Sequence, residues 1–118
     1  MAKILIVDDA SFMRSMIRQV LERGGHEIVG EAENGKVGVE KYVLLKPDVV
    51  TMDLTMPEMQ GIEAVRTIIA FDAAAKIIIC SAMGQQSMVV EALTAGAKNF
   101  LVKPFLPDRL IAAVESLS

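Results

Sequence analysis

Acidic, hydroxyl and amino side chains stand at the ends of the apolar runs in this sequence. Asp8 and Asp9 directly follow one such run, and Asp53 ends another. Ser81 and Lys103 end two more. Oxygen ligands with space for water suit Mg²⁺, and a carboxylate can attack phosphorus to form an acyl phosphate. This set could therefore perform metal-assisted phosphoryl transfer, with the ammonium group neutralising charge and the hydroxyl holding a phosphoryl oxygen.

That chemistry requires the acids to meet in space. Two adjacent carboxylates repel each other, and neither Asp8 nor Asp9 has a basic neighbour in the next few residues. On their own they could be solvated turn residues, or acids at a helix N-terminus, where the helix dipole favours negative charge. Asp53 could likewise be an ordinary turn acid. The elements that carry these residues decide between the alternatives.

Five short apolar runs, rich in isoleucine and valine, are candidate strands. Most of them are continuous and do not alternate with polar residues, which is typical of strands buried on both faces of a parallel sheet. The predicted strands are Lys3–Val7, Glu27–Ala32, Asp48–Asp53, Lys76–Ser81 and Asn99–Lys103.

Helical patterns of apolar residues follow each of these runs. In the first helix, Phe12 and Ile17 belong to one apolar stripe that we expect to be buried. Capping residues and glycines predict where the helices begin or end. These boundary residues are Gly24–Gly25, Asn34, Gly61, Gly96 and, as the N-cap of the last helix, Asp108.

Five strands that alternate with five helices imply an α/β domain with a parallel sheet and right-handed crossovers. In such open sheets the functional crevice lies outside the carboxyl ends of the strands. If the first strand lies beside the third, the three acids cluster, which is unfavourable without a cation. We expect Asp53, the isolated acid on the central strand, to be the nucleophile, while Asp8 and Asp9 mainly bind the metal.

Composition excludes some classes of protein. The chain has 118 residues, which fits one domain, and a net charge of −3 with no basic face, which argues against nucleic-acid binding. No stretch approaches the length of a membrane span. The one cysteine, Cys80, cannot form an internal disulfide, which fits a reducing compartment. We therefore expect a cytoplasmic protein that does not bind a membrane.

Four short motifs resemble those of the response-regulator receiver family in both order and spacing: IVDD, MDLTMPEMQG, CSAM and LVKPF. The similarity covers essentially the whole chain. It implies a single receiver domain over residues 1–118. It also implies a doubly wound, flavodoxin-like sheet of five parallel strands in the order 2-1-3-4-5, with five helices.

By position, the resemblance implies that Asp53 is the phosphoacceptor and that Lys103 and Ser81 assist it. Ser81 also takes the place of the hydroxyl switch residue, and Phe100 takes that of the aromatic switch residue. A cis peptide bond between Lys103 and Pro104 is a further implication, and cis bonds are rare enough for this to be a definite prediction.

The resemblance also implies a Mg²⁺ site. Asp9 would bind the metal directly and Asp8 mostly through water, with Asp53 and the backbone carbonyl of Thr55 as the other protein ligands. The positions flanking the phosphoryl group would be Thr55 and Met83. Neither offers a carboxylate or carboxamide to orient water, so we expect slow, unassisted loss of phosphate, with Met83 partly shielding the group.

Members of the family are phosphorylation-controlled switches in two-component signalling, not enzymes in the ordinary sense. The resemblance implies that a histidine kinase donates the phosphoryl group and that the phosphorylated form binds an output partner through helix four, strand five and helix five. In chemotaxis-type members this partner is the flagellar motor switch protein. A phosphatase is a further candidate partner, and we expect a monomer.

Three alternatives are consistent with parts of the sequence. A phosphorelay intermediate, which passes phosphate to a histidine phosphotransfer protein, has the same fold, and the sequence does not separate the two functions. A hydrolase with an aspartyl-phosphate nucleophile usually carries a second acid two residues later, where this chain has Thr55. A flavodoxin-type binding module would need a phosphate-cradling loop after the first strand, where Asp8 and Asp9 would repel an anion.

Overall fold

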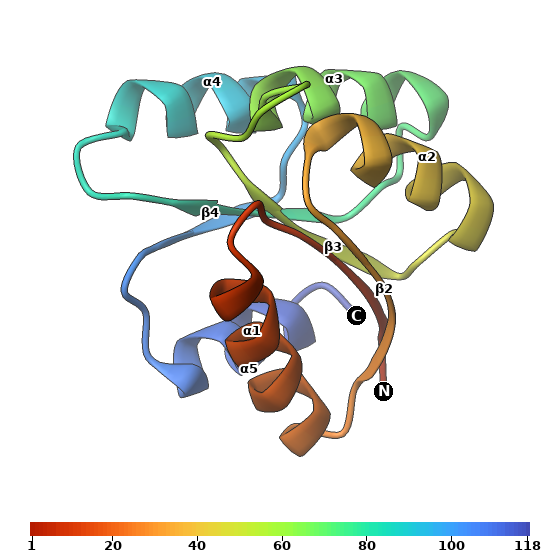
Figure 1. Ribbon diagram of the computed structural model, residues 1–118, viewed down its shortest axis with the longest axis vertical. Coiled ribbons are helices and arrows are strands. Elements are labelled where there is room, and N and C mark those ends of the chain that lie inside the picture. Colours follow the sequence, from red (N-terminus) through yellow and green to blue (C-terminus); the bar gives the residue numbers. More distant parts are fainter.

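The computed structural model describes residues 1–118, in which five strands and five helices alternate (Figure 1). The elements are β1 (Lys3–Val7), α1 (Ser11–Arg23), β2 (Glu27–Ala32), α2 (Gly35–Leu45), β3 (Val49–Asp53), α3 (Gly61–Phe71), β4 (Ile77–Ser81), α4 (Gln86–Ala95), β5 (Asn99–Val102) and α5 (Pro107–Glu115). The strand bounds differ from the predicted ones by at most one residue. Lys103 thus follows β5 and is not its last residue.

The sheet has the order β2-β1-β3-β4-β5, and every neighbouring pair is parallel, which confirms the predicted topology. The register aligns the carboxyl ends of the strands. Val7 pairs with Met52, so Asp8 lies opposite Asp53 in the next position along. Ser81 pairs with Val102, the residue before the lysine. The polar residues at the strand ends therefore gather at one edge.

Helices cover both faces of the sheet: α2, α3 and α4 lie on one side and α1 and α5 on the other (Figure 1). Successive residues of β1 alternate between two buried clusters. Leu5 and Val7 pack in the cluster on the α2–α4 side, while Ile4 and Ile6 pack in the cluster beneath α1 and α5. Because both faces are covered, both sets of side chains are apolar, which explains the continuous apolar run.

Most helix boundaries follow the predicted signals. The Asn34 side chain accepts a hydrogen bond from the Val37 N–H at 2.8 Å, as expected of an N-cap. The expectation that Asp108 caps the last helix is wrong, because α5 begins at Pro107 and Leu106 is its N-cap. Proline suits the first helical position, since its missing N–H would have no helical partner there. Asp108 lies in the first turn instead.

The first helix also departs from the prediction at one residue. Ile17 is buried as expected, but Phe12 is 78% exposed and does not join the apolar stripe. Phe12 lies in the first turn of α1, immediately after the acidic end of β1. No helix in the structure is both long enough and apolar enough to cross a membrane.

The two ends of the described chain meet around His26, just before β2. The His26 Nδ1 accepts a hydrogen bond from the Ala2 N–H at 3.0 Å, and its Nε2 lies 3.7 Å from a carboxylate oxygen of Glu115 in α5. The ring is buried, so His26 packs as a structural residue between the start of β1 and the end of α5. This contact lies at the amino edge of the sheet, opposite the polar strand ends.

Candidate functional site

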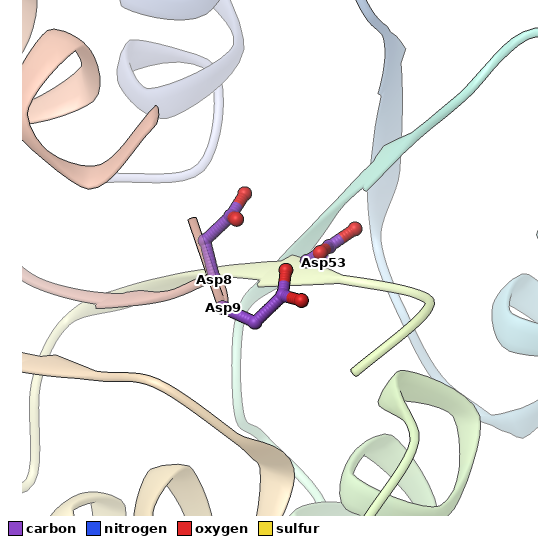
Figure 2. Close-up of side chains that lie close together, drawn as sticks. All are labelled: Asp8, Asp9 and Asp53. Carbon is purple, nitrogen blue, oxygen red and sulfur yellow. The ribbon is translucent and has the colours of Figure 1, made fainter. Parts of the chain in front are cut away.

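Three carboxylates meet at the carboxyl edge of the sheet, as the sequence predicted. Asp8, Asp9 and Asp53 each offer an oxygen atom, and these atoms all lie within 4.8 Å of one another. Figure 2 shows the three side chains beside one another at the ends of β1 and β3. Asp8 and Asp53 are buried and Asp9 is exposed. The set contains only oxygen donors, and its solvent-facing member leaves room for water, so it fits a hard divalent cation such as Mg²⁺.

Local hydrogen bonds hold Asp8 in place. Its Oδ1 accepts from the Ala10 N–H at 2.9 Å, and its own N–H donates to the Ala32 carbonyl at 3.0 Å. The guanidinium of Arg14 donates to the Asp8 carbonyl at 2.7 Å and to Glu31 at 3.1 Å. Sequence reasoning missed Arg14. Its position one turn into the helix after the acids was the only signal for it.

Lys103 reaches the acids from the loop after β5. Its Nζ donates to the Asp8 Oδ2 at 2.9 Å and lies 3.4 Å from the Asp53 Oδ1. The Lys103–Pro104 peptide bond is cis, as the resemblance implied. Burial of the ammonium opposes its charge, but the hydrogen bond to Asp8 and the negative charges of Asp53 and Asp8 outweigh this and raise the pKa of Lys103. The lysine therefore stays charged at neutral pH.

The electrostatic environment of Asp53 differs from that of a surface acid. Burial raises its pKa, and the charge of Asp8 raises it further against the opposing charge of Lys103, to a value of about 6. At neutral pH the carboxylate is mostly ionised, as a nucleophile must be. Its raised pKa also means that positive charge placed nearby would stabilise the ionised form.

The backbone around Asp53 is held by a close approach from α3. The Gly61 N–H donates to the Leu54 carbonyl at 2.9 Å. A Cβ atom on Gly61 would collide with the Asp53 carbonyl oxygen and lie 2.7 Å from the Leu54 Cα. Only glycine fits there without moving the backbone of the central acid.

The predicted switch residues, on the neighbouring strands β4 and β5, both border a cavity beside α4. The Ser81 hydroxyl is buried, and its only hydrogen bond is a long one, 3.4 Å, to the Leu101 carbonyl. The Phe100 side chain is 43% exposed. Both residues line a cavity of about 480 Å³, whose other lining residues come from the β4–α4 loop, α4 and β5. Phe100 therefore lies on the α4 side of the sheet and has open space beside it.

A carboxamide that the sequence did not mark as functional lies beside Thr55. The Gln85 Nε2 donates to the Thr55 Oγ1 at 2.9 Å, and the Gln85 Oε1 accepts from the Ala82 N–H at 2.7 Å. The flanking residues expected from the sequence were Thr55 and Met83, and Met83 is 78% exposed. No spacing rule connects Gln85 with a residue thirty positions earlier, so only the folded arrangement of the two loops reveals this contact.

The fold and site together define a class of doubly wound α/β protein, one with an acidic, cation-compatible site outside the carboxyl ends of its strands. A profile described as "response regulator receiver domain" matches residues 4–115. The chain therefore belongs to the response regulator receiver family, whose members are signalling switches and not enzymes.

Two curated relatives and two solved structures illustrate the similarity. Chemotaxis protein CheY of Thermotoga maritima is 58% identical over 98% of this chain and 97% of its own length. Chemotaxis protein CheY of Bacillus subtilis is 61% identical over 95% of this chain and 93% of its own length. The structure of a CheX-CheY-BeF3-Mg+2 complex from Borrelia burgdorferi is 37% identical, with a TM-score of 0.91 over 97% of this chain and 87% of that chain. A receiver domain protein from Clostridium thermocellum has a TM-score of 0.93 at 28% identity, over 99% of this chain and 94% of that chain.

Proposed function

We propose that the chain is a single receiver domain, residues 1–118, that accepts a phosphoryl group on Asp53 from the phosphohistidine of a histidine kinase. An ionised Asp53 oxygen forms a bond to phosphorus while the bond between phosphorus and the histidine nitrogen breaks, and that nitrogen keeps the electron pair. The observation that carries this proposal is the placement of buried Asp53 beside two further acids and the Lys103 ammonium.

The remaining site residues act on charge and orientation. Asp8, Asp9, Asp53 and the Thr55 carbonyl would hold Mg²⁺, which supplies charge neutralisation for the transferred group. Lys103, now bonded to Asp8 and near Asp53, would neutralise a phosphoryl oxygen from the other side. The Ser81 hydroxyl would turn from its long bond to Leu101 toward the phosphoryl group.

The phosphorylated form would bind an output partner, the flagellar motor switch of chemotaxis, at the surface of α4, β5 and α5. Support comes from relatives in Thermotoga maritima and Bacillus subtilis that carry the name Chemotaxis protein CheY and match nearly the whole chain. The CheX-CheY complex from Borrelia burgdorferi supports a further partner that acts on the phosphorylated form, such as a phosphatase. The protein would act as a cytoplasmic monomer.

Labelling tests the phosphoacceptor. The protein is incubated with acetyl phosphate and Mg²⁺, and the modified residue is mapped by reduction of the acyl phosphate and mass spectrometry. We expect modification at Asp53 and its loss in Asp53→Asn. Full labelling of Asp53→Asn at another acid would overturn the assignment.

A pull-down with and without beryllofluoride, which mimics an aspartyl phosphate, tests the partner. Recovery of flagellar switch components only with beryllofluoride supports the chemotaxis function. Recovery of a histidine phosphotransfer protein in their place would replace it with the phosphorelay function.

A further inference from the structure

One glutamine side chain ties together the two loops that flank Asp53. Gln85 belongs to the β4–α4 loop, and its Oε1 accepts a hydrogen bond from the N–H of Ala82 in the same loop at 2.7 Å. Its Nε2 donates to the hydroxyl of Thr55, in the loop after β3, at 2.9 Å. Ala82 directly follows Ser81, and Thr55 lies two residues after Asp53. Both ends of this carboxamide are therefore engaged across the site.

The neighbouring glutamine provides an internal comparison. Gln86 is the first residue of α4, and its side chain is exposed and makes no hydrogen bond within the chain, whereas that of Gln85 is half-buried. The two residues have the same chemistry, so the bridge is a property of position 85 and not of glutamine in this loop.

A phosphoryl group on Asp53 would need additional hydrogen-bond donors at the carboxyl edge of the sheet. Such a group carries three strong acceptor oxygens. Two donors at the end of β4 are the Ser81 hydroxyl, whose bond to Leu101 is 3.4 Å long, and the Ala82 N–H, which already donates to Gln85. The Ala82 N–H can turn to a phosphoryl oxygen only if its hydrogen bond to Gln85 breaks, and the Gln85 side chain is itself held by Thr55 on the other loop.

We propose that Gln85 is a positioning residue, a latch that holds the β4–α4 loop in its unphosphorylated arrangement and opens when Asp53 carries phosphate. This inference rests on the proposed function of Asp53. Because the hydrogen bonds of the latch exist only in the closed arrangement, they bias the equilibrium toward it and oppose the ligand that opens it.

The latch also bears on the cavity beside Phe100. Ala82, Met83 and Gln85 form part of its lining, together with Phe100. A closed latch therefore fixes one wall of the space into which the ring could turn. When the latch opens, the β4–α4 loop can move toward the phosphoryl group. This movement would link the loop after β3 to the half-exposed Phe100 on β5.

Calorimetric titration with beryllofluoride in saturating Mg²⁺ tests the latch. We expect Gln85→Ala to bind beryllofluoride about 3- to 10-fold more tightly than the parent, which is the range that the net free energy of a hydrogen bond predicts. Thr55→Val removes one anchor and keeps the backbone carbonyl, so it should give a gain in the same direction. Gln86→Ala is the matched control and should leave the affinity unchanged.

Thermal melting without ligand separates a latch from a purely structural clamp. If Gln85 is a latch, Gln85→Ala should melt at a lower temperature and bind beryllofluoride more tightly than the parent. If Gln85 is only a structural clamp, the same variant should melt at a lower temperature without binding beryllofluoride more tightly. Unchanged or weaker binding in both Gln85→Ala and Thr55→Val would overturn the latch. Failure of the parent itself to bind beryllofluoride would instead overturn the proposed function.

Discussion

The Nζ of Lys103 lies 2.9 Å from the Oδ2 of Asp8 and 3.4 Å from the Oδ1 of Asp53, so one ammonium group bridges two of the three clustered acids. The third, Asp9, has no such partner and faces solvent. The cluster thus holds three carboxylates against one cation at neutral pH, and a second cation entering beside Asp9 would relieve the remaining repulsion.

Mg²⁺ should therefore stabilise the fold through this cluster. A ligand that binds only the native state adds stability by mass action, about 2.7 kcal/mol at one hundred times its dissociation constant. We expect the melting temperature to rise with millimolar Mg²⁺, and this rise largely to vanish in Asp9→Ala. Without metal, the variant should melt at or above the parent temperature, because repulsion is relieved. Glu40→Ala, which removes one exposed acid elsewhere, is the control, and an equal metal response in Asp9→Ala would contradict the prediction.

The raised pKa of Asp53 should appear in the pH dependence of stability. In the folded protein the pKa is about 6 against an ordinary 3.8, so folding favours the protonated acid. That stabilisation is complete below about pH 4 and is lost as the pH rises through about 6. In EDTA, Asp53→Asn should therefore gain about 1 to 2 kcal/mol over the parent across this interval, as measured by urea unfolding. A constant difference between the two proteins from pH 4 to 7 would rule this out.

Gly61→Ala should displace the backbone of Asp53, although Gly61 is not itself one of the acidic site residues. The added methyl group collides with the backbone of Asp53 and Leu54, and overpacking of this kind costs about 1–3 kcal/mol. We expect a lower urea midpoint together with slower labelling by acetyl phosphate, because the acid moves with its backbone. Gln60→Ala changes the preceding, exposed N-cap residue, which makes no side-chain capping bond, and should leave labelling unchanged. Normal labelling in a destabilised Gly61→Ala would show that the site tolerates the shift.

Much of this fold was predictable because its determinants are local. Continuous apolar runs mark strands covered on both faces, and in a parallel sheet the carboxyl ends of the strands share an edge. The pattern alone left the strand order open, and the order that the family resemblance implied placed β1 beside β3, where Asp8 and Asp53 meet. The error at Asp108 came from competition between two local signals, since Pro107 satisfies the helix start without a cap.

Sequence reasoning missed one contact between residues six positions apart and one contact between two separate loops. Arg14 binds a backbone carbonyl of Asp8, and Gln85 binds a hydroxyl on another loop. Neither residue type is unusual at its position, and only Arg14 has a partner close to it in the sequence. The contact of Gln85 with Thr55 depends on the crossover geometry that sets one loop beside another, which periodicity does not encode.

Hydrolysis of the acyl phosphate should respond to position 83. Met83 is exposed at the edge of the site and has no group that orients water, while the Gln85 carboxamide is engaged by Ala82 and Thr55. Met83→Gln should therefore speed loss of phosphate several-fold, because a carboxamide can position the attacking water. Decay is followed after removal of acetyl phosphate, with Met83→Leu as the apolar control. Equal or slower decay in the glutamine variant would show that Met83 does not face the phosphoryl group.

Ser81 should transmit the signal without being needed to receive it. Ser81→Ala keeps the acids and Lys103 and should still accept phosphate, but it lacks the hydroxyl that would follow the phosphoryl oxygen. The gain in affinity for a flagellar switch peptide on adding beryllofluoride should therefore be smaller than in the parent, since a ligand shifts an equilibrium only by its differential affinity. Fluorescence anisotropy of the labelled peptide measures both affinities. An identical gain in the two proteins would remove Ser81 from the switch.

The contact of His26 with Ala2 and Glu115 has a practical consequence for engineering. The contact holds both ends of the described chain at the amino edge of the sheet, whereas the acidic cluster lies at the carboxyl edge. A fluorescent protein or surface anchor joined at either end would be tethered on the side away from the chemistry. Paired fusions at the two ends would also sit close to each other, which suits a resonance-energy-transfer reporter, and a short linker across this gap would suit circular permutation.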